Sequence, residues 1–158
     1  KVPVQKIKSF VLGGHGDSMV AMLESTEVEG KKINTLIKEG KISKERLNQI
    51  VDRTKKGGAE IVKYLEKGSA FYAPAASGIE MAECYLKDLK KQIPCAAHLD
   101  GEYGFKNIYA GVPVVIGANG VEKIIELELS ETEKKDFNHS IQSVKDLFEA
   151  ARKIDSSL

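Results

Sequence analysis

"SFVLGGHGDSMVAM", residues 9–22, contains two apolar runs separated by a glycine-rich stretch with one histidine and one aspartate. The apolar runs belong to the segments Lys6–Leu12 and Met19–Ser25, which have the length of β-strands, and the glycines between them favour a turn. Segment Thr26–Ile33 follows, with a turn candidate at Glu29–Gly30. We therefore expect three antiparallel strands here, with His15 on the turn between the first two.

Two helical patterns follow these strands. From Ser43, a residue type that favours the N-cap position, apolar side chains recur at helical spacing as far as Glu66. Gly57–Gly58 lies inside this helix and weakens it by about 1 kcal/mol per residue, so the pair predicts close packing against another backbone or a kink, of which packing is favoured. A second helix is predicted to extend to Leu89, with Pro74 in its first turn.

The remaining segments predict strands and one more helix. Segments 93–99 and 107–130 read as strands, with a hairpin turn at Asn119–Gly120 and alternating apolar and acidic residues over 125–129. Ser130 and Glu133 have the spacing of a capping box, which opens the last helix. This order predicts an α+β fold of antiparallel strands and long amphipathic helices. Because no G-x-G-x-x-G motif follows the first strand, we expect no Rossmann domain in this chain.

Composition restricts the classes of partner. A chain of 158 residues is the size of one domain, so we expect a single domain over residues 1–158. Lys and Arg number 24 against 23 Asp and Glu, a balance that offers no basic field for nucleic acid or a membrane surface. The longest uncharged stretch, 107–121, is shorter than the roughly 20 apolar residues of a membrane span. Small molecules and other subunits are the expected partners.

The cysteines and the first ten residues are informative about the cellular compartment and about the start of the chain. Cys84 and Cys95 lack the spacing of a zinc site or a disulfide framework, and reduced thiols in the cytoplasm are the expected state. Residues 1–10 lack the apolar core of a signal peptide, and the chain does not begin with methionine. We therefore expect that Lys1 is not the natural start and that further sequence precedes it.

His15 is the residue best suited to chemistry. Histidine is the side chain best suited to general acid–base catalysis near neutral pH, and His15, between glycines at the end of a strand, would be accessible for it. The alternative is a tight turn in which His15 and Asp17 only cap backbone groups. A metal site is not expected, because His98 and His139 lie in unrelated segments. A serine hydrolase is not expected either, since no G-x-S-x-G motif is present.

Five segments, in order along the chain, resemble one family. These are "VLGGHGDSMV", "KGSAFYAPAAS", "YLKDLKKQIPCAAHLDGEYG", "YAGVPVVIGANGVEKIIELELS" and the closing amphipathic helix. Together they resemble the C-terminal, substrate-binding half of malate dehydrogenases of the lactate-dehydrogenase-like type. The resemblance covers essentially the whole chain.

The resemblance implies a cytoplasmic, NAD-dependent oxidoreductase of the tricarboxylic acid cycle that interconverts malate and oxaloacetate and assembles as a homodimer or homotetramer. His15 stands at the family's catalytic histidine position, Ala70 where a small or hydroxylated residue faces the substrate, and Pro74 where an apolar side chain packs near the nicotinamide. Ordinary packing at a helix start explains Ala70 and Pro74 equally well.

The family's partners of the histidine are not found in this sequence. In the family, an aspartate pairs with the histidine and an arginine grips the substrate carboxylate, and both precede the histidine strand, as does the domain that binds most of the NAD. Asp17 is no evident replacement. We therefore expect the isolated chain to be inactive. Two alternatives stay open: a dehydrogenase of lactate or another 2-hydroxy acid, and a non-catalytic domain that acts through subunit contacts, with the helix from Ser43 and segment 73–78 as candidate surfaces.

Overall fold

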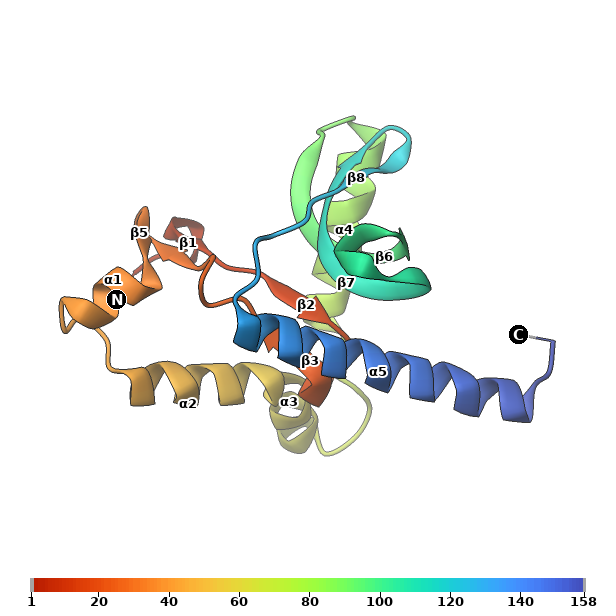
Figure 1. Cartoon of the computed structure of the whole chain (residues 1–158), viewed down its shortest axis with the longest axis horizontal. Helices are drawn as coiled ribbons and strands as arrows, with labels where there is room; N and C mark the ends of the chain where they lie inside the picture. The colour runs from red at the N-terminus through yellow and green to blue at the C-terminus, as the bar shows by residue number, and fades with distance from the viewer. Residues whose placement is uncertain (1, 158) are drawn as a thin grey trace.

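Figure 1 shows the computed structural model, which describes residues 2–157. Every strand pair among these residues is antiparallel, and the strands form two sheets. The strands are β1 (Ile7–Lys8), β2 (Val11–Gly13), β3 (Met19–Ala21), β4 (Glu27–Val28), β5 (Lys31–Lys32), β6 (Lys91–Asp100), β7 (Lys106–Gly117) and β8 (Gly120–Ile124). The helices are α1 (Ile33–Lys38), α2 (Lys44–Lys55), α3 (Gly57–Leu65), α4 (Tyr72–Leu86) and α5 (Glu131–Ile154). The predicted α+β class, without a parallel Rossmann sheet, is confirmed.

The N-terminal strands are shorter and more numerous than the predicted three. The chain leaves one sheet for the other at Ser9, whose hydroxyl shares a 3.1 Å hydrogen bond with that of Thr26. As a result β1 pairs with β4 in a small three-stranded sheet, whereas β2 pairs with β3 in the larger sheet, which has the order β3-β2-β7-β6 with β8 beside β7. The predicted turn at Glu29–Gly30 is confirmed between β4 and β5, with φ of 51° and 78°.

The predicted helix from Ser43 to Glu66 is two helices. Ser43 caps α2 as predicted, since its hydroxyl accepts from the Arg46 N–H at 3.0 Å. The helix breaks at Lys56, and α3 begins at Gly57. A Cβ on Gly57 or Gly58 would meet no other part of the described chain within 4 Å, so the predicted kink is confirmed and close packing against a backbone of this chain is not found.

The hairpin of β7 and β8 forms as predicted, with its turn centred one residue earlier, at Ala118–Asn119. The predicted strand to Ser130 ends at Ile124. The Ile125 N–H still donates to the Pro113 carbonyl of β7 at 2.8 Å, but among the described residues no backbone hydrogen bond joins 126–130 to a strand, and a side chain holds the segment. The Tyr103 hydroxyl donates to the Ile125 carbonyl at 2.9 Å and accepts from the Leu127 N–H at 3.0 Å.

The core lies between the larger sheet and α5, which runs across the hairpin of β2 and β3 (Figure 1). The predicted capping box is confirmed, because the Ser130 hydroxyl and the Glu133 carboxylate each accept from the other residue's N–H. Phe137 and Ile141, farther along α5, are buried against the sheet. Within residues 2–157, no helix has the length and apolar character needed to cross a membrane.

Candidate active site

His15 lies on the loop between β2 and β3 and its side chain is exposed. Its own backbone is extended, with φ −96° and ψ 150°, and a short 3-10 turn, Gly16–Ser18, follows it. Gly13 and Gly16 on either side have φ of +89° and +73°, in the region that side chains disfavour. The glycines that flank the histidine are therefore required by the path of the loop.

Gly13 lies where three elements cross. On one side it pairs with Gly111 of β7, where a Cβ on Gly111 would come within 2.8 Å of the Gly13 carbonyl oxygen. On the other side a Cβ on Gly13 would come within 2.1 Å of Ser140 Oγ on α5. The backbone before His15 is therefore held between a strand and a helix, with no room for a side chain.

Helix α5 also holds both arms of the hairpin by hydrogen bonds. The Ser140 hydroxyl accepts from the Gly14 N–H at 2.8 Å, at the end of β2. The Glu133 carboxylate, through Oε1, accepts from the Glu24 N–H at 3.1 Å, beyond β3. Ser140 and Glu133 are both buried. Sequence reasoning missed both contacts, although a polar Ser140 among the apolar positions 137, 141 and 144 was a signal that could have revealed one of them.

The His15 imidazole has no hydrogen-bond or ion-pair partner among residues 2–157. Asp17 is two residues away in sequence, and its charge acts instead on Lys56, at the C-terminal end of α2. The pKa of Lys56 is raised by its hydrogen bond with Asp52 and the charge of Asp52, with a smaller contribution from Asp17. The loop therefore presents a free imidazole, and Asp17 does not orient it.

The other two predicted site residues follow α3. Ala70 is half-buried in the connection to α4, and Pro74 is exposed at the third residue of α4, within the first turn as predicted. No hydrogen bond or ring contact joins either residue to His15 in the described part of the chain. The structure therefore holds the backbone before His15 in place, but it shows no direct contact that joins His15 to Ala70 or Pro74 among the described residues.

The remaining histidines lie on the surface. His98 on β6 is exposed and meets the Tyr109 ring edge-on, with ring centroids 5.2 Å apart. His139 on α5 is also exposed. Cys84 is buried and Cys95 half-buried, both as free thiols, and burial raises the pKa of Cys95. None of these groups joins His15.

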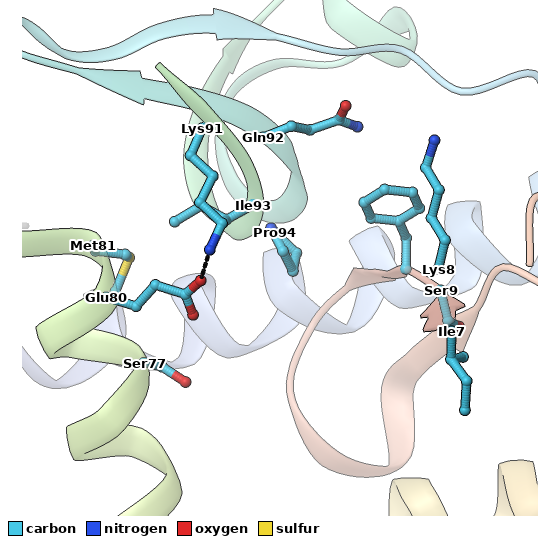
Figure 2. A pocket seen from close by; sticks show the side chains of 11 residues that line it. Ile7, Lys8, Ser9, Ser77, Glu80, Met81, Lys91, Gln92, Ile93 and Pro94 are labelled. Carbon is cyan, nitrogen blue, oxygen red and sulfur yellow. Dashed lines mark hydrogen bonds and ion pairs between the residues drawn. The ribbon is translucent and has the colours of Figure 1, made fainter. Parts of the chain in front are cut away.

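Figure 2 shows a pocket of about 380 Å³ between β1, α4 and β6, away from the predicted site residues. Its polar centre is an ion pair in which the Lys91 ammonium donates to the Glu80 carboxylate at 2.6 Å. The hydrogen bond with Glu80 and its charge raise the pKa of Lys91. Neither His15, Ala70 nor Pro74 lines this pocket. The candidate site is thus the exposed His15 loop itself and not this cavity.

Comparison with known proteins shows which family the chain matches. Residues 1–154 match the family described as the lactate/malate dehydrogenase, alpha/beta C-terminal domain. Malate dehydrogenase of Pelagibacter ubique is 65% identical over 157 residues, which are 99% of this chain and 49% of that protein. The chain spans about half the length of the curated relatives it matches.

Two solved structures from Cryptosporidium parvum have nearly the same likeness to the chain. Malate dehydrogenase has a TM-score of 0.93 at 41% identity, covering 96% of this chain and 48% of that one. Lactate dehydrogenase, complexed with lactic acid and nicotinamide adenine dinucleotide, has a TM-score of 0.92 at 42% identity, covering 94% and 47%. The two backbones fit this chain equally well.

Proposed function

This chain belongs to the family of lactate/malate dehydrogenase C-terminal domains, and we propose that residues 1–158 are the substrate-binding half of a cytoplasmic, NAD-dependent malate dehydrogenase. The observation that carries the proposal is His15. Its imidazole is exposed and has no hydrogen-bond or ion-pair partner among residues 2–157, and the backbone before it is held on both sides. Such a group is suited to exchange a proton with a bound substrate.

His15 is proposed to take the proton of the malate hydroxyl as the C2–H bond breaks and the carbonyl of oxaloacetate forms. Bound NAD supplies the hydride acceptor. In the reverse direction the imidazolium of His15 donates a hydrogen bond to the carbonyl oxygen and then transfers its proton. A neutral imidazole accepts a proton and an imidazolium donates one, so His15 is suited to both directions.

Ala70 and Pro74, near the start of α4, are proposed to meet only the substrate and the nicotinamide end of the cofactor. Ala70, which is half-buried, is proposed to face the substrate, and the exposed ring of Pro74 is proposed to pack near the nicotinamide. The sequence contains no glycine-rich phosphate-binding loop of the G-x-G-x-x-G type, so the pyrophosphate and adenosine require another part of the protein. We infer that this part precedes the chain and also brings the aspartate and arginine that work with His15.

Malate is favoured over lactate because the curated relatives are malate dehydrogenases. The experiment is to express the full-length protein and compare the NADH-dependent reduction of oxaloacetate and pyruvate. We expect oxaloacetate to have the higher kcat/KM. Preference for pyruvate would instead make the protein a lactate dehydrogenase, and the isolated chain of 158 residues is expected to show no turnover.

The role of His15 is tested by His15→Asn in the full-length protein. We expect kcat/KM to fall by about 10²–10⁴-fold, the range for loss of a general acid–base group. His139→Asn is the matched control, because His139 is exposed on α5 and, among the described residues, no hydrogen bond or ion pair joins its side chain to the loop. Equal effects of the two substitutions would contradict the role of His15.

A second role, in assembly, is favoured by the surface of α3 and α4. No residue of α3 is buried and only Cys84 of α4 is, while Tyr72, Ile79 and Leu86 on α4 are 80%, 69% and 79% exposed. Apolar surface of this extent is typical of an interface. We propose that the cofactor-binding half or a second subunit covers it in a homodimer or homotetramer. Light scattering of full-length Ile79→Lys is expected to show a smaller assembly, or a misfolded one, than the unsubstituted protein.

A further inference from the structure

Ser140 is a fully buried hydroxyl beside Phe137 and Ile141 on the face of α5 that packs on the His15 hairpin. Buried polar side chains in a core usually serve a specific hydrogen bond. The Ser140 hydroxyl accepts from the Gly14 N–H at 2.8 Å. Gly14 is the residue directly before His15, so this bond fixes the Gly13–Gly14 peptide, one peptide unit before the one that leads into the histidine.

The fit around this bond leaves the backbone little freedom. The position that a Cβ on Gly13 would take lies 2.1 Å from Ser140 Oγ, and the one on Gly14 lies 3.3 Å from Val144 Cγ2. Both glycines therefore lie directly against α5, one turn apart on that helix. Ser140 sets how closely the helix and the loop approach each other.

Helix α5 also binds the hairpin at a second point, so the contribution that is specific to Ser140 can be identified. Glu133 lies two turns before Ser140 on α5 and accepts from the Glu24 N–H, beyond the second arm of the hairpin. The hairpin is thus attached to α5 even without Ser140. What Ser140 adds is the position of the arm that ends at His15.

We propose that Ser140 is a positioning residue for His15, an inference that rests on the proposed function. Its hydroxyl holds the Gly14 amide so that the exposed imidazole leaves the hairpin in the direction needed for proton transfer. Displacement of a reacting group by even about 1 Å can lower a rate by orders of magnitude. Ser140 itself exchanges no proton with substrate.

The substitution Ser140→Ala separates positioning from stability. It removes the acceptor of the Gly14 N–H, which weakens the fold. Alanine has a higher helix propensity than serine, which offsets part of that loss. We therefore expect Tm to change little, whereas kcat is expected to fall substantially.

The experiment compares Ser140→Ala with Ser143→Ala in the full-length protein. Ser143 is the matched control, since it also lies on α5 and its hydroxyl donates only to the His139 carbonyl of the same helix, at 3.2 Å. The measurements are kcat and KM for oxaloacetate, the isotope effect with deuterated NADH, and Tm. For Ser140→Ala we expect kcat to fall about tenfold, KM to change less than about twofold, and the isotope effect to increase.

Ser140→Cys adds a graded test, because a thiol keeps an acceptor at this position, but a weaker and larger one than a hydroxyl. Its kcat is expected to lie between those of Ser140→Ala and the unsubstituted protein. Equal kcat values for Ser140→Ala and Ser143→Ala would overturn the positioning role alone. An unsubstituted protein that reduces neither oxaloacetate nor pyruvate would overturn the proposed function, and this inference with it.

Discussion

Helices α5 and α4 differ in how much of their surface is buried in the core. On α5, Phe137, Ser140 and Ile141 are buried against the sheet and the His15 hairpin. On α4 only Cys84 is buried, and large apolar side chains such as Ile79 face outward. The difference teaches that apolar content alone does not locate the core of this chain. The region that holds the candidate site is closed by the chain's own residues, whereas the apolar face of α4 is open to a partner.

The largest expected effect comes from truncating the centre of the closed region. Phe137 is 1% exposed and meets the rings of Tyr103 and Phe105 edge-on. Phe137→Ala is expected to lower the free energy of unfolding of the chain by about 3–5 kcal/mol. Ile79→Ala, on the open face, is expected to change it by less than about 0.5 kcal/mol. Urea unfolding followed by circular dichroism measures both, and similar losses would erase the contrast.

Two glycines give a second test of the same contrast. Gly13→Ala places a Cβ against Ser140 at a φ of +89°, so strain and a clash are expected to lower the free energy of unfolding by about 2–4 kcal/mol. Gly58 lies inside α3 with open space around it. Gly58→Ala is expected to raise the free energy of unfolding by up to about 1 kcal/mol. Thermal unfolding should therefore show Tm shifts of opposite sign.

A smaller effect is expected where a single hydroxyl is removed. The Tyr103 hydroxyl bonds the backbone on both sides of Glu126 and so fixes the path from β8 to α5. Tyr103→Phe is expected to lower the free energy of unfolding by about 1–2 kcal/mol. Tyr85 on α4 is exposed, and Tyr85→Phe serves as the control with an expected change below about 0.5 kcal/mol. A loss in Tyr85→Phe that matched the one in Tyr103→Phe would count against the role of this hydroxyl.

The smallest expected effect is one of pH. Burial raises the pKa of Tyr103 above its usual value of 10, the hydrogen bond from the Leu127 N–H opposes this, and the charge of Glu126 adds to the rise. The folded chain therefore keeps the phenol proton at a pH where the unfolded chain has lost it. This contribution to stability is complete below about pH 10 and is lost as pH rises through the folded-state pKa. The difference in unfolding free energy between the chain and Tyr103→Phe should shrink above pH 10.

The parts of the fold with strong local signals could be predicted from the sequence. The N-cap at Ser43, the capping box at Ser130 and the turn at Glu29–Gly30 each depend on residues close in sequence, and all three form. The end of β8 at Ile124 could not be predicted. The alternation over 125–129 is typical of a strand, but among the described residues the pairing with β7 ends at the Ile125 N–H. The Tyr103 hydroxyl then bonds the Ile125 carbonyl and the Leu127 N–H.

The candidate site divides in the same way. His15 could be singled out because glycines in an apolar hairpin are unusual, and the structure shows that Gly13 has no space for a side chain. The role of Ser140 could not be read from local patterns, because Gly14 and Ser140 are 126 residues apart. Only the packing of α5 on the hairpin brings them together.

That separation has a consequence for the order of events during synthesis. The ribosome adds about 5–20 residues per second, so Ser140 follows Gly14 out of the peptidyl transferase centre after about 6–25 s. Throughout that interval the histidine loop exists without the helix that holds it. A chain released before α5 was made would carry His15 on an unfixed loop, so this helix completes a site that was begun 126 residues earlier.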